Sequence, residues 1–256
     1  MRSRSVPTVA ALALVTFLAL PADASTGAFA PAGTCALAYN NELSYTAEPG
    51  VANELTVIKA GQFIHLEDEA GPINGCNAHP NIVGKVSTNT TVVKIRIVLG
   101  DEDDIVTVTA PGVPTIIFGG DGNDELAAAD GKNDLRGGNG DDELRGSGGP
   151  DRLRGDAGDD QLRGHTGDDV LNGGAGEDEL RGDAGADELT GGQGIDDLRG
   201  GPDNDELNGS GGDDELDGGA GDDALNGGPG DDELTGGPDA DDCKGGAGAD
   251  TTSACE

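Results

Sequence analysis

The chain has 256 residues, and 50 Asp and Glu against 15 Lys and Arg give it a formal net charge of −35. Aromatic residues make up only 2% of the sequence, whereas 47 residues are Gly. Nucleic acids and anionic membranes repel so acidic a chain, and it has no aromatic platform on which bases could stack. The shortage of large apolar side chains also excludes an ordinary close-packed globule. A disordered acidic chain remains, or a fold that neutralises its carboxylates with cations.

Residues 1–24 have the pattern of a secretory signal peptide. Two arginines precede an apolar stretch at residues 9–20, and small residues follow as far as Ala24. This apolar stretch is too short to span a bilayer. We therefore expect cleavage after Ala24 and a secreted, extracellular protein.

Residues 25–118 are richer in β-branched side chains and predict a small β domain that caps the start of the following segment. In the most regular stretch, Ile95 and Ile97 alternate with Lys94 and Arg96, which indicates a strand with one buried face. The expected strands are residues 53–59, 62–66, 91–98, 105–109 and 115–118.

Residues 119–253 divide into 15 units of nine residues without an insertion or deletion. The unit at residues 137–145 shows the pattern, with Gly at positions 1, 2 and 4, Asp at position 6 and Leu at position 8. Position 1 is Gly in every unit except at Ala128, and Cys243 and Thr252 replace the position-8 Leu in the last two units. A disordered acidic linker would not hold Leu at every ninth residue.

Each position of the unit has a physical role. Glycines at positions 1, 2 and 4 allow a tight turn through positive φ, and position 6 places a carboxylate at its end. Positions 7 to 9 predict a three-residue strand with one inward Leu. Two units then form one coil whose leucines fill a thin interior.

Such an array needs help to fold. One buried Leu in nine residues offsets little of the entropy lost on ordering the chain. The array also carries 38 acidic against 9 basic side chains, which repel one another. A divalent cation would supply the missing stabilisation and would reduce the repulsion between the acidic side chains. Carboxylate and carbonyl oxygens suit Ca²⁺, whereas Mg²⁺ demands a stricter octahedron and Zn²⁺ prefers nitrogen and sulfur.

The candidate metal ligands are the position-6 side chains together with the turn carbonyls. Successive units point to opposite edges, so cations would lie between a unit and the next but one. Seven gaps on one edge and six on the other allow at most 13 Ca²⁺ ions. The first edge carries Asp124, Asp142, Asp160, Asp178, Asp196, Asp214, Asp232 and Asp250, and the second carries Asn133, Asp151, Asp169, Asp187, Asp205, Asp223 and Asp241.

The nine-residue pattern closely resembles the calcium-binding repeat of the RTX (repeats-in-toxin, haemolysin-type) family, over residues 119–253. The resemblance implies an all-β protein with a parallel β-roll, a solenoid of about 15 nonapeptide repeats, from a secreted bacterial protein. It also implies that position-6 Asp side chains and turn carbonyls of stacked units ligate Ca²⁺.

Departures from the pattern mark special positions. Asn133 brings an oxygen but no charge, so we expect the gap that it shares with Asp151 to bind most weakly. Asp203 and Asp239 replace the position-4 Gly, and Asp tolerates a left-handed backbone better than most residues. Just before the array, a degenerate unit has Asp104 at position 6, and whether Asp104 binds metal is left open.

The four cysteines agree with an exported protein. Four cysteines allow three pairings, and the sequence does not select one. The long array between them favours local pairing, Cys35 with Cys76 and Cys243 with Cys255. Cys243 stands at an inward position near the tail, residues 254–256, and predicts a disulfide-bonded terminal cap.

No catalytic motif is evident. The sequence contains neither an HExxH helix nor a GxSxG elbow, and His65, His79 and His165 have no spacing typical of a site. We expect a non-enzymatic calcium-binding protein without a nucleic-acid partner or membrane span. The alternatives are a lytic toxin, a calcium-dependent hydrolase with its site in residues 25–118, and an adhesin that uses the roll as a spacer. No macromolecular partner is identified.

Overall fold

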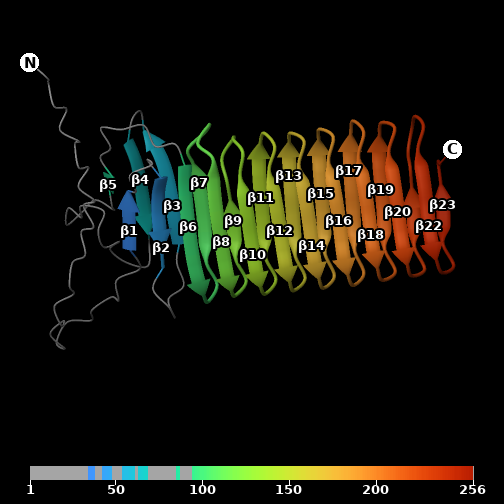
Figure 1. Cartoon of the computed structure of the whole chain (residues 1–256), viewed down its shortest axis with the longest axis horizontal. Helices are drawn as coiled ribbons and strands as arrows, with labels where there is room; N and C mark the ends of the chain where they lie inside the picture. The colour runs from blue at the N-terminus through green and yellow to red at the C-terminus, as the bar shows by residue number, and fades with distance from the viewer. Residues whose placement is uncertain are drawn as a thin grey trace, which may run out of the picture.

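The computed structural model describes residues 34–37, 42–47, 54–60, 63–68, 85–86 and 94–255. The expected signal peptide, residues 1–24, lies outside them. The described chain is an all-β parallel solenoid of about 9 turns over residues 95–253. Figure 1 shows its strands stacked in chain order along one long axis, with the C-terminus at one end. The predicted β-roll is thereby confirmed.

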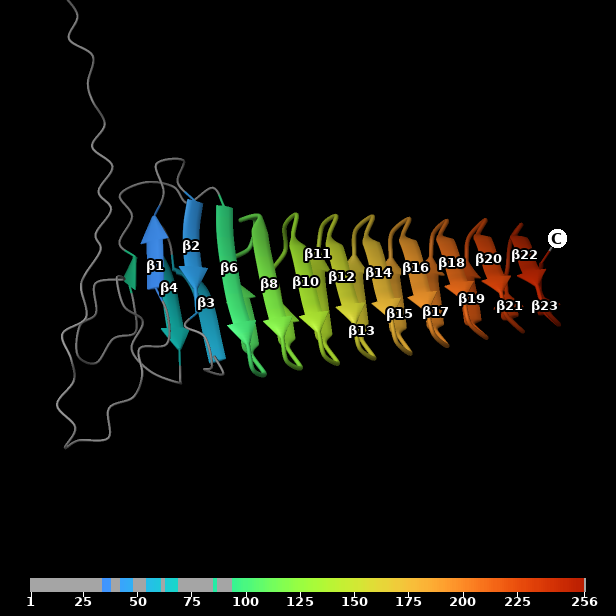
Figure 2. The same cartoon turned by 60° about the horizontal axis from the view of Figure 1, so that its bottom comes forward.

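Two parallel sheets form the walls of the roll (Figure 2). Sheet A contains, in order, β1 (Thr34–Leu37), β2 (Glu42–Thr46), β6 (Lys94–Asp101), β8 (Thr115–Asp121), β10 (Asp134–Asn139), β12 (Arg152–Ala157), β14 (Val170–Ala175), β16 (Glu188–Gln193), β18 (Glu206–Gly211), β20 (Ala224–Pro229) and β22 (Asp242–Ala247). Sheet B contains, in order, β23 (Thr251–Ser253), β21 (Glu233–Thr235), β19 (Glu215–Ala220), β17 (Asp197–Pro202), β15 (Glu179–Ala184), β13 (Gln161–Thr166), β11 (Glu143–Gly148), β9 (Glu125–Ala127), β7 (Ile105–Thr109), β3 (Glu54–Ala60), β4 (Phe63–Asp68) and β5 (Lys85–Val86).

The strands of the repeats are longer than the sequence predicts. A typical strand, β15, has six residues and covers positions 7 to 9 of one unit and positions 1 to 3 of the next. Position-1 glycines such as Gly182 do not have positive φ, whereas glycines at positions 2 and 4 do. The expectation of three-residue strands, with position 1 in the turn, is therefore wrong. In such units the turn is confined to positions 4 to 6, whereas β9 and β21 have only three residues.

A single column of leucines in each sheet forms the core of the repeats. Leu135 pairs with Leu153, and Leu153 with Leu171, in a register of 18 residues, which is two units for each coil. These side chains are at most 1% exposed. The first coil is more apolar, because β6 alone buries Ile95, Ile97 and Leu99.

The strands expected before the array are present as β3, β4, β6, β7 and β8. β2 pairs with β6, and β3 with β7, in parallel, so the first coils continue directly into the repeats. The antiparallel pairs β1–β2, β3–β4 and β4–β5 lie at the N-terminal end of the two sheets. Ile95 and Ile97 are buried, which confirms the predicted buried face of that strand.

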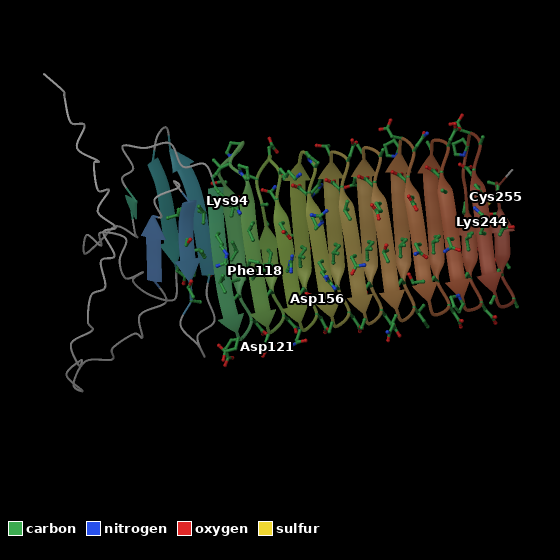
Figure 3. The ribbon with its side chains drawn as sticks, viewed as in Figure 1. Lys94, Phe118, Asp121, Asp156, Lys244 and Cys255 are labelled. Atoms are coloured by element: carbon green, nitrogen blue, oxygen red, sulfur yellow. A yellow bond between two sulfur atoms is a disulfide. The ribbon has the colours of Figure 1, made fainter. Side chains whose placement is uncertain are left out.

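The C-terminal end is closed by a disulfide between Cys243 of β22 and Cys255, whose Cα atoms are 5.8 Å apart. Figure 3 shows Cys255 at the last coil of the roll. The predicted pairing is confirmed here, whereas Cys76 of the other expected pair lies outside the described residues. In the part of the chain that the structure describes, no helix is long and apolar enough to cross a membrane.

Candidate metal centre

The turns place one position-6 side chain per unit at the two edges of the roll. In each turn the position-4 residue takes positive φ, as Gly158 does at 130°. Asp203 and Asp239 adopt the same conformation, with φ of 80° and 87°, as expected for residues that tolerate it. The chain therefore reverses within three residues and presents position 6 where the next strand begins.

The position-6 side chains line up in two columns. The eight predicted ligands from Asp124 to Asp250 follow one edge, here called edge 1, and the seven from Asn133 to Asp241 follow the other, edge 2. Every one of them is at most 3% exposed, except Asp250 in the last coil, which is half-buried. The structure thus brings together on each edge the side chains that the repeat spacing predicts there.

Hydrogen bonds join neighbours within each column. The backbone N–H of a position-6 residue donates to the Oδ1 atom of the position-6 side chain one coil later. On edge 1, Asp142 donates to Asp160 at 2.8 Å, and on edge 2, Asp151 donates to Asp169 at 2.7 Å. This bond uses one oxygen of each carboxylate and fixes the direction of the other.

The second carboxylate oxygen, Oδ2, is buried and unsatisfied. Within the described part of the chain, no hydrogen-bond donor reaches Oδ2 of any position-6 Asp from Asp124 to Asp241. Beside Gly146, a Cβ atom would meet Asp151 Oδ2 at 2.5 Å and the carbonyl oxygen of Gly164 at 2.9 Å. The position-1 Gly therefore leaves room for a carboxylate oxygen that faces another acceptor. Such an arrangement is costly unless a cation lies between the oxygens.

The electrostatic cost is visible in the pKa values of these carboxyls. Burial raises the pKa of Asp160 to about 8, and the neighbouring carboxylates of Asp142 and Asp178 add to the rise. The same causes, burial first, act along both columns. The pKa rises to about 7 at Asp124, Asp151, Asp187 and Asp205, and to about 6 at Asp142, Asp178, Asp196 and Asp214.

The donor set fits a hard cation. Among the described residues, no three His, Cys, Asp or Glu side chains cluster closely enough to hold a metal by themselves. Backbone carbonyls must therefore complete any coordination shell, and the carbonyl of Gly164 beside Asp151 Oδ2 is placed to do so. Carboxylate and carbonyl oxygens in a flexible number are the ligands of Ca²⁺. The residues present fit the predicted ion.

A second ladder, at position 5, escaped the sequence analysis. The backbone N–H of Asp159 donates to Asp141 Oδ1 at 3.0 Å, and that of Glu177 donates to Asp159 Oδ1 at 2.8 Å. These bonds run in the direction opposite to the position-6 ladder, so neighbouring turns are bonded both ways. The recurring acidic pair at positions 5 and 6 was the available signal.

The degenerate unit before the array has the same geometry. Asp104 is 1% exposed, and its backbone N–H donates to Asp124 Oδ1 at 2.9 Å. Glu102 stands at position 4 with φ of 76°. Edge 1 therefore begins one coil earlier than the regular repeats.

The histidines form no site in the described residues. His165 lies at position 2 on the outside of β13, where Nδ1 is 3.5 Å from Asp183 Oδ2. Burial and the nearby Arg163 lower the pKa of His165. The side chain of His65, and all of His79, lie outside the described residues.

The family model of the RTX calcium-binding nonapeptide repeat (4 copies) matches residues 116–144, 136–171, 154–189, 163–198, 190–225 and 217–252. These overlapping segments cover more than half of the sequence and coincide with the coils that carry the two columns. No curated protein matches the chain.

Proposed function

The chain belongs to the RTX family of calcium-binding nonapeptide repeat proteins, and on that premise we propose that it binds Ca²⁺ between stacked turns and completes its folding on the ions. The observation that carries the proposal is the pair of columns of buried, unsatisfied Asp Oδ2 atoms. None of these oxygens has a hydrogen-bond donor, and one Ca²⁺ in a gap would link two coils. Binding is then part of folding and should be cooperative along the roll.

The role of each group follows from its position. The position-6 carboxylate supplies charge, its hydrogen-bonded Oδ1 fixes the rotamer, and the position-1 Gly leaves the space in which Oδ2 lies. The leucines hold the two sheets together behind the ions. Calcium itself would supply positive charge to balance the 38 acidic side chains of the array.

We infer further that the protein is secreted and has no catalytic activity. The signal-peptide pattern of residues 1–24 supports export, and calcium outside a cell commonly reaches the range of about 10⁻⁴–10⁻³ M in which extracellular modules bind. N-terminal sequencing of protein recovered from the culture medium should begin at Ser25.

A role as a rigid extracellular element is favoured, because about 9 coils at about 4.8 Å each make a rod of roughly 43 Å.

Far-ultraviolet circular dichroism during a calcium titration tests the main proposal. We expect a cooperative gain of β signal with Ca²⁺, its loss on adding chelator, and no gain with Mg²⁺ at the same concentration. Asp178→Asn should raise the calcium midpoint, because it removes the charge of a buried ladder carboxylate. Asp159→Asn is the matched control and should raise the midpoint less, because its side chain is exposed and an amide oxygen can still accept the Glu177 N–H. A spectrum indifferent to Ca²⁺ would overturn the proposal.

A further inference from the structure

One position in the two columns has a satisfied side chain. The amide nitrogen of Asn133 donates to the carbonyl oxygen of Ala129 at 2.9 Å and to Asp151 Oδ1 at 2.9 Å, and it lies 3.4 Å from the carbonyl oxygen of Gly146. In every other unit up to Asp241, the corresponding atom is an unsatisfied carboxylate oxygen. At this gap alone, a hydrogen-bond donor points at the group of acceptors.

The orientation of the amide is determined by its neighbours. Asn133 Oδ1 accepts the backbone N–H of Thr115 at 3.2 Å, and the backbone N–H of Asn133 donates to Asp151 Oδ1 at 2.8 Å. Exchanging the amide oxygen and nitrogen would place two acceptors together at Asp151 and two donors together at Thr115. Only the observed orientation satisfies both.

Further departures occur in the same unit, and two of them oppose a cation. Position 1 is Ala128, whereas the other units have a Gly here that leaves space for the carboxylate Oδ2. Position 5 is Lys132, the only basic residue at this position in the array, and it is exposed beside the gap. The unit therefore loses the negative charge, loses the space and gains a positive charge.

We propose that the hydrogen bonds donated by the Asn133 amide replace the contacts of a calcium ion, so that the gap between Asn133 and Asp151 is closed by hydrogen bonds and binds no metal. This inference rests on the proposed function. It corrects the expectation of a weak site in this gap, and it lowers the largest number of ions in the regular array from 13 to 12. It also means that β8, β10 and β12 are joined at edge 2 without metal.

Native mass spectrometry of the full chain, titrated with Ca²⁺, counts the ions bound to each variant. Asn133→Ala should bind the same number as the wild type, because the side chain ligates no ion. Asp142→Ala is the matched control on edge 1 and should bind at least one ion fewer. The combined variant Ala128→Gly, Ala129→Gly, Lys132→Ala and Asn133→Asp restores a regular unit and should bind one ion more.

The outcomes separate this inference from the proposed function. A loss of one ion in Asn133→Ala, or no gain in the combined variant while Asp142→Ala shows its loss, would overturn the inference and leave calcium binding intact. A wild-type protein that binds no Ca²⁺ would instead overturn the proposed function. The calcium midpoint of folding gives a second readout. Asn133→Ala should raise it, since Asp151 and two carbonyls lose their donor.

Discussion

Acid should partly replace calcium in folding this protein. The pKa of Asp187 is raised by burial from its ordinary 3.8 to about 7 in the metal-free roll. A carboxyl whose pKa is higher in the folded than in the unfolded state binds more protons when folded. It therefore destabilises the folded state increasingly as the pH rises from about 4 to 7. Below about pH 4 the penalty disappears. Stability of the metal-free roll should therefore fall as the pH rises from 5 to 8.

The magnitude is large because the columns repeat the effect. The rise in the pKa of Asp187 from 3.8 to about 7 corresponds to about 4 kcal/mol for this one carboxyl at pH 8. Nine ladder carboxyls have pKa values of about 6 to 8. Even about 1 kcal/mol from each would equal the unfolding free energy of a typical domain, about 5–15 kcal/mol.

Circular dichroism in the presence of chelator, from pH 8 down to pH 5, measures this effect. We expect β signal to appear without calcium, with a midpoint between about pH 6 and 7. Light scattering is the control, because the isoelectric point of about 4.1 favours aggregation at lower pH. A metal-free chain that is equally disordered at pH 5 and pH 8 would refute the reasoning from buried ladder carboxyls.

Three further predictions concern packing and closure. Leu180→Ala should destabilise the calcium-loaded roll by about 2–5 kcal/mol, seen as a lower denaturant midpoint, because each strand of the repeats has only one inward leucine. Gly182→Ala should raise the calcium midpoint, since its Cβ would displace the ladder carboxylate of its own unit, whereas Gly211→Ala, whose nearest neighbour would be a carbonyl 3.8 Å away, should leave the midpoint unchanged. Reducing the disulfide between Cys243 and Cys255 should speed hydrogen exchange in β22 and β23 only; faster exchange throughout the roll would contradict a local cap.

Much of the fold could be predicted because the same nine-residue pattern occurs 15 times in succession. A Leu at every ninth residue fixes the core, and the two-unit coil follows from one inward residue per strand. The columns of Asp followed from the same spacing, and the structure confirms their two edges. Strand length could not be predicted as well. A glycine is compatible with both turn and extended backbone, and the crowding by Oδ2 at position 1 shows that Gly182 is required for space and not for a positive φ.

The site details that escaped prediction depend on hydrogen-bond direction. An Asp at position 5, such as Asp159, has the same composition signal whether it is free in solvent or accepts a bond from the next coil. The role of Asn133 likewise depends on which atom of its amide faces Asp151, and no spacing reveals that. Sequence reasoning identified Asn133 as a weak point through its missing charge. In the structure its amide nitrogen donates hydrogen bonds to Asp151 Oδ1 and to the carbonyl oxygen of Ala129.

The two edges present the same ladder in different electrostatic fields. The edge-1 turns open onto a groove of about 510 Å³ that contains exposed acidic residues such as Glu177 and Asp213, and no basic residue lines it. A groove on edge 2, in contrast, is lined by Lys94, Lys132 and Arg152 as well as by Asp134, Asp151 and Asp168. An acidic groove concentrates cations near its base, whereas basic residues repel them. Since odd-numbered units form edge 1 and even-numbered units edge 2, identical position-6 carboxylates should bind Ca²⁺ more tightly on edge 1. The Asn133 gap is thus the extreme case of a weaker edge.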